Sequence, residues 1–588
     1  MSADPTQPAE PQAKTQAATQ AATQAATQAA TQAATQAAAE FAALAADYLG
    51  DLAQRHPDTA TRLGDHRFDD RLPEDYPAAR TAERQALDGF AVRLSALDTA
   101  ALPAELAVDA VMLAEGIARR IFEIDELREH TWNPLRANPG QAVYLLLARE
   151  FAPLPERLAA LAGRLAQIPE TLAVARAQLE SMPTVHLETA IGQFDGTIKL
   201  VTSEVDAALR RAGEESPASR RAVDEAVGAV RPAALEALAV HRDWLAATLE
   251  ARKTGAAGNL VPEADPRIGP ERFARKLSLT LSAAADAGSI LARAEQDLDR
   301  VTEDITGLAA ELGGTPREVL GRLAAAAPDD TTILRFCADA LAAQTAFVRE
   351  HDLVTLYDDP VELIDMPEID RGIAVAYCDS PGPLEAAPLP TFIAVSPVPD
   401  GWTPERKASF YREYNRHMVH NLMVHEAMPG HYLQLQHSRR FSGATRIRAA
   451  LRSGAFTEGW AVYTEELMAR HGYPGEGDPR AVRMQQLKMQ LRTAINAILD
   501  ARVHAYGMTE AEAMALMTGR GFQEEGEAAG KWRRALLTSA QLSTYYVGYT
   551  EVSDLAAELT AQGYPERVIH DSMLAHGSPP VRLLRAVL

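Results

Sequence analysis

The sequence predicts a mainly α-helical protein with a small β-sheet, on three observations. From Glu40 onward, Ala, Leu, Arg and Glu dominate, and apolar residues recur at three- and four-residue spacing, which is typical of amphipathic helices. Pro and Gly interrupt this pattern at intervals, as expected between helices. One short stretch instead resembles strands. The clearest helical stripes comprise Leu158, Leu161, Leu165 and Ile168, and Leu235, Leu238, Trp244 and Leu245; the interruptions fall at 133–134, 138–140, 255–270 and 313–316.

The N-terminal segment has low complexity. Residues 15–38 are six copies of Thr-Gln-Ala-Ala, which offer no large apolar side chain to offset the entropy of ordering. We therefore expect residues 1–38 to form a disordered tail. Residues 39–588 are expected to form a single large helical domain, with a sub-division near 255–270 into an N-terminal helical lobe and a C-terminal lobe that carries the chemistry.

The β-rich stretch lies within residues 371–399. It contains Arg371-Gly-Ile-Ala-Val-Ala-Tyr377, a turn rich in Pro and Gly, and Thr391-Phe-Ile-Ala-Val-Ser396. Short β-rich runs on either side of turn residues predict two or three strands. The helical pattern resumes at Thr403-Pro404, which is typical of an N-cap followed by Pro at the first helical position.

Composition excludes several classes of protein. The chain has 588 residues, with 58 Lys and Arg against 80 Asp and Glu, a formal charge of −22. This balance argues against binding nucleic acid or anionic lipid, since both require clustered cations. Two cysteines, Cys337 and Cys378, are too few for a disulfide framework or a multi-cysteine zinc site. We see no signal peptide and no apolar run of about 18 residues, so we expect a cytoplasmic protein.

The strongest chemical signal is His425-Glu-Ala-Met-Pro-Gly-His431. It resembles the zinc-peptidase motif His-Glu-x-x-His, in which both histidines lie on one helix face and the Glu activates water. Here the second His comes six residues after the first, so on an unbroken helix the two rings would point roughly 120° apart. Pro429-Gly430 can interrupt the helix and so return His431 to a shared metal ion.

A catalytic zinc site usually has three protein ligands. Glu458 lies 27 residues after His431 in the run Thr457-Glu-Gly-Trp-Ala-Val-Tyr-Thr-Glu465, and we predict it as the third ligand. Glu465 is seven residues further along, on the same helix face, where it could hold a ligand histidine in orientation. The alternative for either glutamate is a solvated helix face.

This combined pattern resembles the bacterial family called domain of unknown function 885. Further matches lie at 63–67, 138–141, 267–271, 541–548 and 576–580, so the resemblance covers about residues 45–588. The resemblance implies a gluzincin-type metallopeptidase, similar in outline to helical thermostable carboxypeptidases and thimet-type oligopeptidases. It implies a large helical fold with a deep channel and a small β-sheet near the active-site helix.

The motif and the resemblance together suggest roles for single residues. His425, His431 and Glu458 would hold one Zn²⁺, although Co²⁺ or Mn²⁺ also suits imidazole and carboxylate. Glu426 would act as general base and then general acid. Because a C-terminal tyrosine stabilises the oxyanion in the resembling helical peptidases, Tyr545 is the candidate for that role here, with Tyr546 as the alternative.

Further candidates come from segments that resemble the family pattern. A peptide carboxylate would favour a bidentate arginine, and Arg533 and Arg492 lie in such segments, as do His504 and His576. The alternative for each is a structural or surface residue. The run 392–396 could pair with an extended substrate, or it could be plain sheet.

We therefore expect a zinc-dependent hydrolase, specifically a metallopeptidase that cleaves short peptides. Two alternatives stay open: a metal-dependent amidase of small-molecule metabolism, and a non-catalytic helical binding scaffold with a vestigial metal site. The presence of Glu426 argues against the scaffold, because a structural metal site needs no general base. The sequence leaves open the substrate, the choice between exo- and endo-cleavage, and the oligomeric state.

Overall fold

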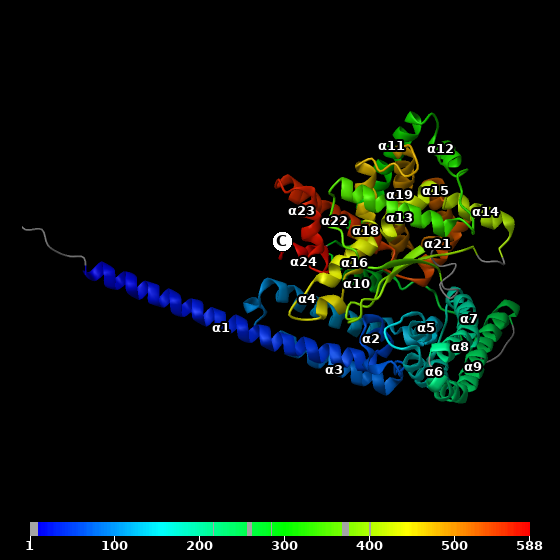
Figure 1. The fold of residues 1–588 in the computed structure, drawn as a ribbon, viewed down its shortest axis with the longest axis horizontal. Coiled ribbons are helices and arrows are strands. Elements are labelled where there is room, and N and C mark those ends of the chain that lie inside the picture. Colours follow the sequence, from blue (N-terminus) through cyan, green and yellow to red (C-terminus); the bar gives the residue numbers. More distant parts are fainter. Residues whose placement is uncertain (1–9, 216, 256–260, 284, 367–375, 399–401) are drawn as a thin grey trace, which may run out of the picture.

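The computed structural model describes residues 10–215, 217–255, 261–283, 285–366, 376–398 and 402–588. It is mainly α-helical with one three-stranded sheet (Figure 1), which confirms the predicted fold class. Short 3-10 or π turns occupy η1 (His66–Phe68), η2 (Thr99–Ala101), η3 (Glu123–Leu127), η4 (Glu129–Thr131), η5 (Pro134–Ala137) and η6 (Leu200–Glu204). None of the helices described here is long and apolar enough to cross a lipid bilayer.

The first helix, α1 (Glu10–Arg55), runs through the Thr-Gln-Ala-Ala repeat and projects from the rest of the molecule (Figure 1). This differs from the disordered tail that we expected over residues 1–38, of which residues 1–9 lie outside the described part. Ala has the highest helix propensity, and threonine hydroxyls bond carbonyls one turn back, as from Thr27 to Thr23 at 2.9 Å. Burial begins only at Ala37 and Phe41, so packing anchors the C-terminal part of α1 and the repeat extends it.

Two further N-terminal helices, α3 (Pro77–Ser95) and α4 (Ala104–Phe122), and two C-terminal residues share a core with α1. The short helix α2 (Pro57–Leu63) follows α1 directly in the sequence. Phe41, Leu44 and Leu113 pack in one cluster with Ile447 and Leu583. The N-terminus of the chain is therefore joined to its C-terminal region, and the residues before 255 do not form one lobe.

A second group of helices forms a separate lobe, seen at the lower right of Figure 1. It comprises α5 (Gly140–Ala148), α6 (Leu154–Gln178), α7 (Thr184–Lys199), α8 (Val205–Glu215) and α9 (Pro217–Thr254). Its core contains the predicted stripe of Leu158, Leu161, Leu165 and Ile168, all of them buried. Each helix of this lobe thus buries one apolar face against its neighbours, as the spacing indicated.

The small sheet has the strand order β1-β3-β2, with β1 (Val361–Asp365), β2 (Ala376–Asp379) and β3 (Thr391–Val395). β1 runs parallel to β3 and β2 runs antiparallel to it. Two of the strands lie in the predicted stretch 371–399, whose residues 371–375 and 399 fall outside the described part. β1 precedes that stretch. β2 packs beside the helix that ends in Glu426, so the sheet lies next to the candidate centre.

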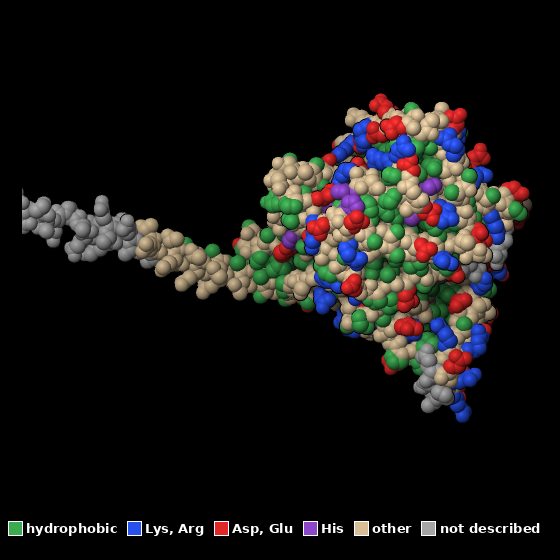
Figure 2. All heavy atoms as spheres, turned by 45° about the horizontal axis from the view of Figure 1, so that its top comes forward, with side chains coloured by type: hydrophobic (Ala, Val, Ile, Leu, Met, Phe, Trp, Pro, Cys, Tyr) green, Lys and Arg blue, Asp and Glu red, His purple; other side chains and the backbone are tan. Residues whose placement is uncertain are grey.

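The remaining helices build the C-terminal region. They are α10 (Pro270–Leu281), α11 (Ala287–Glu311), α12 (Pro316–Leu323), α13 (Ile333–Glu350), α14 (Pro404–Glu413), α15 (Arg416–Glu426), α16 (His431–Arg440), α17 (Ile447–Ala450), α18 (Gly454–Arg470), α19 (Pro479–Tyr506), α20 (Glu510–Gly519), α21 (Glu525–Leu537), α22 (Ser543–Ala561), α23 (Glu566–Leu574) and α24 (Val581–Leu584). As predicted, α14 begins with a Thr403 cap, whose hydroxyl accepts the Arg406 N–H. Acidic and basic side chains are interspersed on the face drawn in Figure 2.

Helices α18 and α22 approach each other unusually closely. A Cβ atom on Gly548 would lie 1.8 Å from the Ala455 carbonyl oxygen, and one on Gly459 would lie 2.2 Å from the Gly548 carbonyl carbon. Only glycine fits at these two positions, since real Cβ atoms do not approach backbone atoms so closely. This contact sets the spacing between the helix that carries Glu458 and the helix that carries Tyr545.

Candidate metal centre

The two motif histidines lie on different helices. α15 ends at Glu426 and α16 begins at His431, so the helix is broken where Pro429-Gly430 predicted it. A Cβ atom on Gly430 would lie 2.0 Å from the His425 carbonyl oxygen, so the close return of the chain requires glycine. Trp460 of α18 donates its indole N–H to the Pro429 carbonyl at 2.9 Å. The break between α15 and α16 is therefore fixed by close packing of Gly430 on α15 and by a hydrogen bond from α18.

Both histidines converge on Glu458. The Nε2 atom of each ring lies 3.5 Å from Glu458 Oε2, and the three ligand atoms all lie within 4.8 Å of one another. Two ligand atoms at about 2.0–2.2 Å from zinc and at a tetrahedral angle are about 3.3–3.6 Å apart. The two rings are nearly perpendicular, at 85°. The spacing of the His–Glu pairs thus fits a tetrahedral ion.

The polar environment of these atoms also fits a cation. Glu458 Oε2 makes no hydrogen bond within the described residues, and the side chains of His425, His431 and Glu458 are 11%, 11% and 24% exposed. Burial alone would raise the pKa of Glu458, but the two histidines outweigh it and hold that pKa low. Burial would lower the pKa of His425, whereas Glu458 and Glu465 raise it well above its usual range. The carboxylates therefore favour positive charge at this point.

Glu465 lies where we predicted it, behind His425. Its Oε1 atom is 2.8 Å from His425 Nδ1, and its Oε2 atom accepts a hydrogen bond of 2.6 Å from the Asn421 amide. With a proton on Nδ1, the Nε2 lone pair of His425 is directed at the candidate ion. Sequence reasoning missed Asn421, although its position one helical turn before His425 places it on the same helix face.

Glu426 lies between the centre and the sheet. Its Oε2 atom accepts the Cys378 backbone N–H of β2 at 3.1 Å. Burial raises the pKa of Glu426, the two histidines lower it and Glu458 raises it, with a net upward shift. β2 therefore positions the predicted general base directly, a role for the sheet that the sequence did not indicate.

The two candidate tyrosines point to different places. The Tyr545 hydroxyl accepts a hydrogen bond of 3.0 Å from Arg534. The pKa of Tyr545 is raised first by burial and next by the Glu458 carboxylate, so this ring is close to the centre. The Tyr546 hydroxyl donates to Asp297 of α11 at 2.6 Å instead. The alternative assignment to Tyr546 is therefore corrected, because α22 buries that residue against another helix.

The two arginines proposed as substrate anchors have protein partners. Arg533 of α21 bonds Glu188 at 3.1 Å and Thr189 at 2.7 Å, both on α7. Arg492 of α19 bonds Glu527 at 2.5 Å. We therefore correct both assignments: Arg533 ties the α5–α9 lobe to the C-terminal region, and Arg492 is held in a partly buried ion pair.

The two remaining histidine candidates are likewise structural. His504 Nε2 lies 2.9 Å from the Ala535 carbonyl and 2.8 Å from the Thr538 carbonyl, at the end of α21. His576 Nδ1 lies 2.7 Å from Glu105 Oε1 of α4. Both imidazoles are thus held by partners outside the candidate centre, so these assignments are corrected too.

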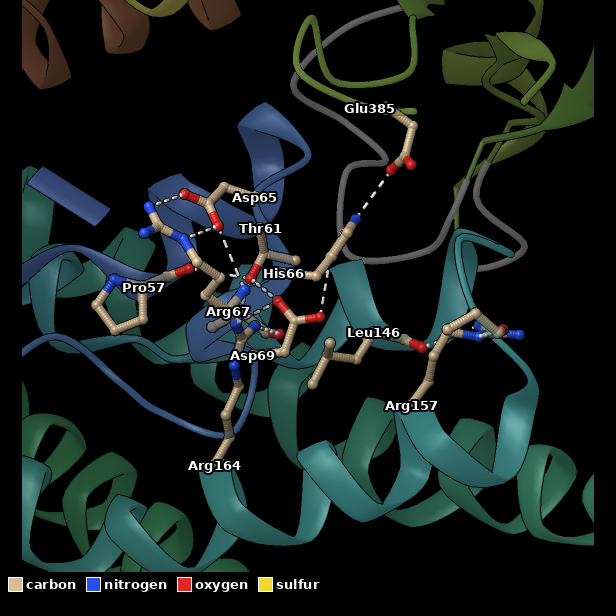
Figure 3. Close-up of polar contacts among 12 residues, drawn as sticks. Pro57, Thr61, Asp65, His66, Arg67, Asp69, Leu146, Arg157, Arg164 and Glu385 are labelled. Carbon is tan, nitrogen blue, oxygen red and sulfur yellow. Dashed lines mark hydrogen bonds and ion pairs between the residues drawn. The ribbon is translucent and has the colours of Figure 1, made fainter. Parts of the chain in front are cut away.

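An N-terminal turn is tied to the loop that follows β2 (Figure 3). His66 bridges Asp69 and Glu385, with 2.9 Å from Nδ1 to Asp69 and 2.9 Å from Nε2 to Glu385. Its ring stacks on Phe151 at 3.7 Å, and the Leu384 N–H donates to the Leu63 carbonyl at 2.7 Å. Sequence reasoning missed Glu385, which lies more than 300 positions from its partner. This contact braces the strand that holds Glu426.

Two solved structures are similar to this chain over almost its whole length. One is "a putative lipoprotein of unknown function" from Shewanella oneidensis, with a TM-score of 0.76 and 27% identity, covering 93% of this chain and 99% of that one. The other is "the putative lipoprotein" from Colwellia psychrerythraea, with a TM-score of 0.74 and 17% identity, covering 94% of this chain and 98% of that one. The second likeness shows the fold alone.

No curated protein matches this chain. Residues 57–588 match the family described as "Bacterial protein of unknown function (DUF885)". That match spans the N-terminal turn, the sheet, the broken helix and all three candidate ligands. The chain therefore belongs to the DUF885 family.

Proposed function

We propose that this protein is a zinc-dependent hydrolase, specifically a metallopeptidase that cleaves short peptides. The observation that carries the proposal is that His425 and His431 each place Nε2 3.5 Å from Glu458 Oε2, with all three ligand atoms within 4.8 Å of one another and Glu426 beside them. A bound zinc ion would polarise the scissile carbonyl and lower the pKa of water. Overall, water adds across the C–N bond: its hydroxyl goes to the carbonyl carbon and its proton to the leaving amine.

Glu426 is suited to moving that proton. The Cys378 N–H occupies its Oε2 atom, and Oε1 makes no hydrogen bond in the described part of the chain. Oε1 would accept the proton of the attacking water and pass it to the amine nitrogen. Because β2 fixes the carboxylate, the distance between base and water does not depend on a mobile loop.

Tyr545 is suited to stabilising the negative charge that develops on the carbonyl oxygen. Arg534 donates to its hydroxyl oxygen, so the phenolic hydrogen is free to be donated elsewhere. Burial and Glu458 raise the pKa of Tyr545, which keeps the phenol protonated. Such a donor, held in place before the reaction, supports the charge without reorganisation.

The decisive test combines metal content with peptide turnover. We expect the purified protein to bind one zinc ion and to hydrolyse short peptides, and Glu426→Gln to keep the zinc while losing about 10²–10⁴-fold in kcat. Glu551→Gln is the matched control, since Glu551 lies among Arg585, Arg582 and Asp554. Negligible zinc in the wild-type protein would overturn the proposal. Bound zinc with turnover of small-molecule amides alone would favour an amidase, and bound zinc without turnover a binding scaffold.

The adjacent tyrosines provide a second test. Tyr545→Phe should lower kcat about 10²–10³-fold, because one oxyanion donor is lost. Tyr546→Phe should keep the activity and lower the stability by about 1 kcal/mol, because it loses a hydrogen bond to Asp297. Steady-state kinetics and thermal unfolding measure the two effects. Equal kinetics for both variants would remove Tyr545 from the mechanism.

The cellular location stays a prediction. The sequence favours the cytoplasm, whereas each of the two similar structures is described as a "putative lipoprotein". The proposed chemistry does not depend on the compartment, because neither cysteine is among the residues assigned a side-chain role in it.

A further inference from the structure

A group of buried and half-buried charges lies on α14, α19 and α21, beyond Tyr545. Lys488 forms an ion pair of 2.9 Å with Glu413, and Arg492 forms one of 2.5 Å with Glu527. Lys531 lies in the same group and is only 7% exposed. In the part of the chain that the structure describes, its ammonium makes no hydrogen bond or ion pair. The two carboxylates are thus matched by two other cations, and Lys531 is left over.

Arg534 adds a second cation, which forms no ion pair with a carboxylate among the described residues. Its guanidinium donates to the neutral Tyr545 hydroxyl at 3.0 Å and to the Gln541 amide oxygen at 2.9 Å. Burial, and then Arg492 and Arg534, depress the pKa of Lys531 well below its usual range. Within the described residues, neither cation therefore has a carboxylate in direct contact, although Glu527 and Glu413 attract Lys531 from further away, in a chain whose net charge is −22.

This arrangement favours the binding of an anion. Burial without a directly paired carboxylate disfavours the charged form of Lys531, and an anion beside it would favour that form. Lys531 Nζ is absent from the buried polar atoms that lack both a partner and contact with solvent, so solvent reaches it. A ligand carboxylate could reach it as well and would supply the missing counter-charge, in a charge-assisted hydrogen bond.

The position of these cations relates them to the metal centre. Lys531 and Arg534 are three residues apart on α21, so they share one face with about 5–6 Å between their Cβ atoms. Arg534 contacts Tyr545, whose hydroxyl is close to Glu458. An extended peptide advances about 3.3–3.6 Å per residue. A group bound by Lys531 would therefore lie one or two residues from a carbonyl held at Tyr545.

We propose that Lys531 and Arg534 bind the C-terminal carboxylate of a short peptide, so that the site removes one or two residues from the C-terminal end. This inference rests on the proposed hydrolase function and specifies its substrate class. The bond that breaks is the amide one or two residues before the terminus, and the products are a shortened peptide and a free amino acid or dipeptide. Lys531 and Arg534 are specificity-determining residues, and the chemistry stays with Glu426 and Tyr545.

The first experiment measures binding and does not require turnover. The full-length Glu426→Gln protein, loaded with zinc, is titrated with N-acetyl-Ala-Ala-Ala as the free acid and as the C-terminal amide. We expect the acid to bind at least about ten-fold more tightly, since a charge-assisted contact is lost in the amide. Adding Lys531→Met should reduce that ratio to about one, and adding Lys531→Arg should restore most of it. Lys276→Met is the matched control, because Lys276 has its own partner, the Ser539 hydroxyl at 2.8 Å.

The outcomes of this experiment are distinct. Equal binding of acid and amide, or a preference that survives Lys531→Met, would overturn the carboxylate anchor. A third peptide, amidated but ending in Asp, tests the source of the anion: binding as tight as that of the free acid would overturn the C-terminal assignment in favour of an acidic side chain. Because Lys531 makes no hydrogen bond or ion pair with the described residues, we expect Lys531→Met to fold, which circular dichroism checks. Even if Lys531→Met does not fold, the comparison of acid with amide on the Glu426→Gln protein still tests the proposal.

The second experiment measures hydrolysis by the wild-type holoenzyme. Mass spectrometry should show loss of one or two C-terminal residues from the free acid, with a KM at least about ten-fold below that of the amide. Cleavage at internal bonds, or equal KM values for acid and amide, would overturn the proposal and leave the hydrolase intact. If nothing is hydrolysed while acid binding still depends on Lys531, the proposed hydrolase fails and the anchor stands.

Discussion

The metal centre and the α5–α9 lobe each bury histidines, and the two pairs differ in their partners. His186 of α7 and His241 of α9 make no hydrogen bond through either ring nitrogen in the described structure. Aromatic rings lie beside them: the ring centroid of Trp132 is 5.3 Å from that of His186, and the ring centroid of Phe194 is 4.8 Å from that of His241. Burial lowers the pKa of each to about 4, and nearby backbone groups offset this only in part.

The histidines of the metal centre are also buried, each 9% exposed, and His425 has the opposite electrostatics. Carboxylates lie on both sides of His425, at 3.5 Å and 2.8 Å, and raise its pKa in spite of burial. The comparison shows that a buried imidazole by itself is a neutral core residue. It becomes a candidate ligand where a second imidazole and a carboxylate leave unshared lone pairs facing one point.

The largest expected effect separates the two pairs by zinc content. His431→Leu should abolish the binding of one zinc ion per chain, because one of the three ligands disappears. The loss of affinity should exceed the roughly 10–100-fold that follows from changing a residue that only supports a ligand. His241→Leu makes the same substitution in the lobe and should leave zinc unchanged. Atomic absorption after dialysis against a weak chelator measures both. If His431→Leu contained as much zinc per chain as the wild-type protein, the distinction between the two histidine pairs would fail.

The next effect concerns stability in acid. An unfolded histidine has a pKa of about 6.5, and His186 and His241 have pKa values of about 4 in the fold. Between these values the unfolded state binds protons that the folded state does not, so stability falls as the pH drops from about 6.5 to 4. The full loss approaches about 3 kcal/mol per histidine. Leucine at both positions should flatten this slope.

Chemical denaturation at several pH values tests that prediction. The wild-type protein should lose stability steadily below pH 6.5, and the double leucine variant should lose less, with the gap largest near pH 4. At pH 8 the histidines are neutral in both states, so their protonation contributes nothing and any difference reflects packing alone. Parallel slopes for the two proteins would show that these histidines are protonated in the fold, against the contrast drawn above.

The sequence predicted the parts of the site that depend on local spacing. His425, His431 and the break at Pro429-Gly430 lie within seven positions, and Glu458 and Glu465 repeat on one helix face. The helical stripes of the α5–α9 lobe were predicted in the same way. Periodicity suffices in these cases because neighbours along a helix have fixed relative directions.

The errors arose where partners distant in the sequence decide direction. Tyr545 and Tyr546 are adjacent, and only the packing of α22 between α18 and α11 determines which of them faces the centre. Arg533 is directed to α7 by Glu188, and the leftover charge of Lys531 is visible only once all the nearby ion pairs are known. The repeat segment of α1 was misjudged for another reason: helix propensity extends a helix whose far end is anchored by packing.

The smallest effect tests the second layer of the centre with two adjacent glutamates. Glu465 accepts from His425 and Asn421, whereas Glu466 accepts from the Tyr549 hydroxyl instead. Glu465→Gln should weaken zinc binding about 10–100-fold, because the amide carries no charge and its NH₂ group would face the Asn421 donor or the His425 N–H. Glu466→Gln should leave the affinity unchanged. Competition with a calibrated chelator measures both constants, and equal affinities would mean that the charge behind His425 contributes nothing to the metal.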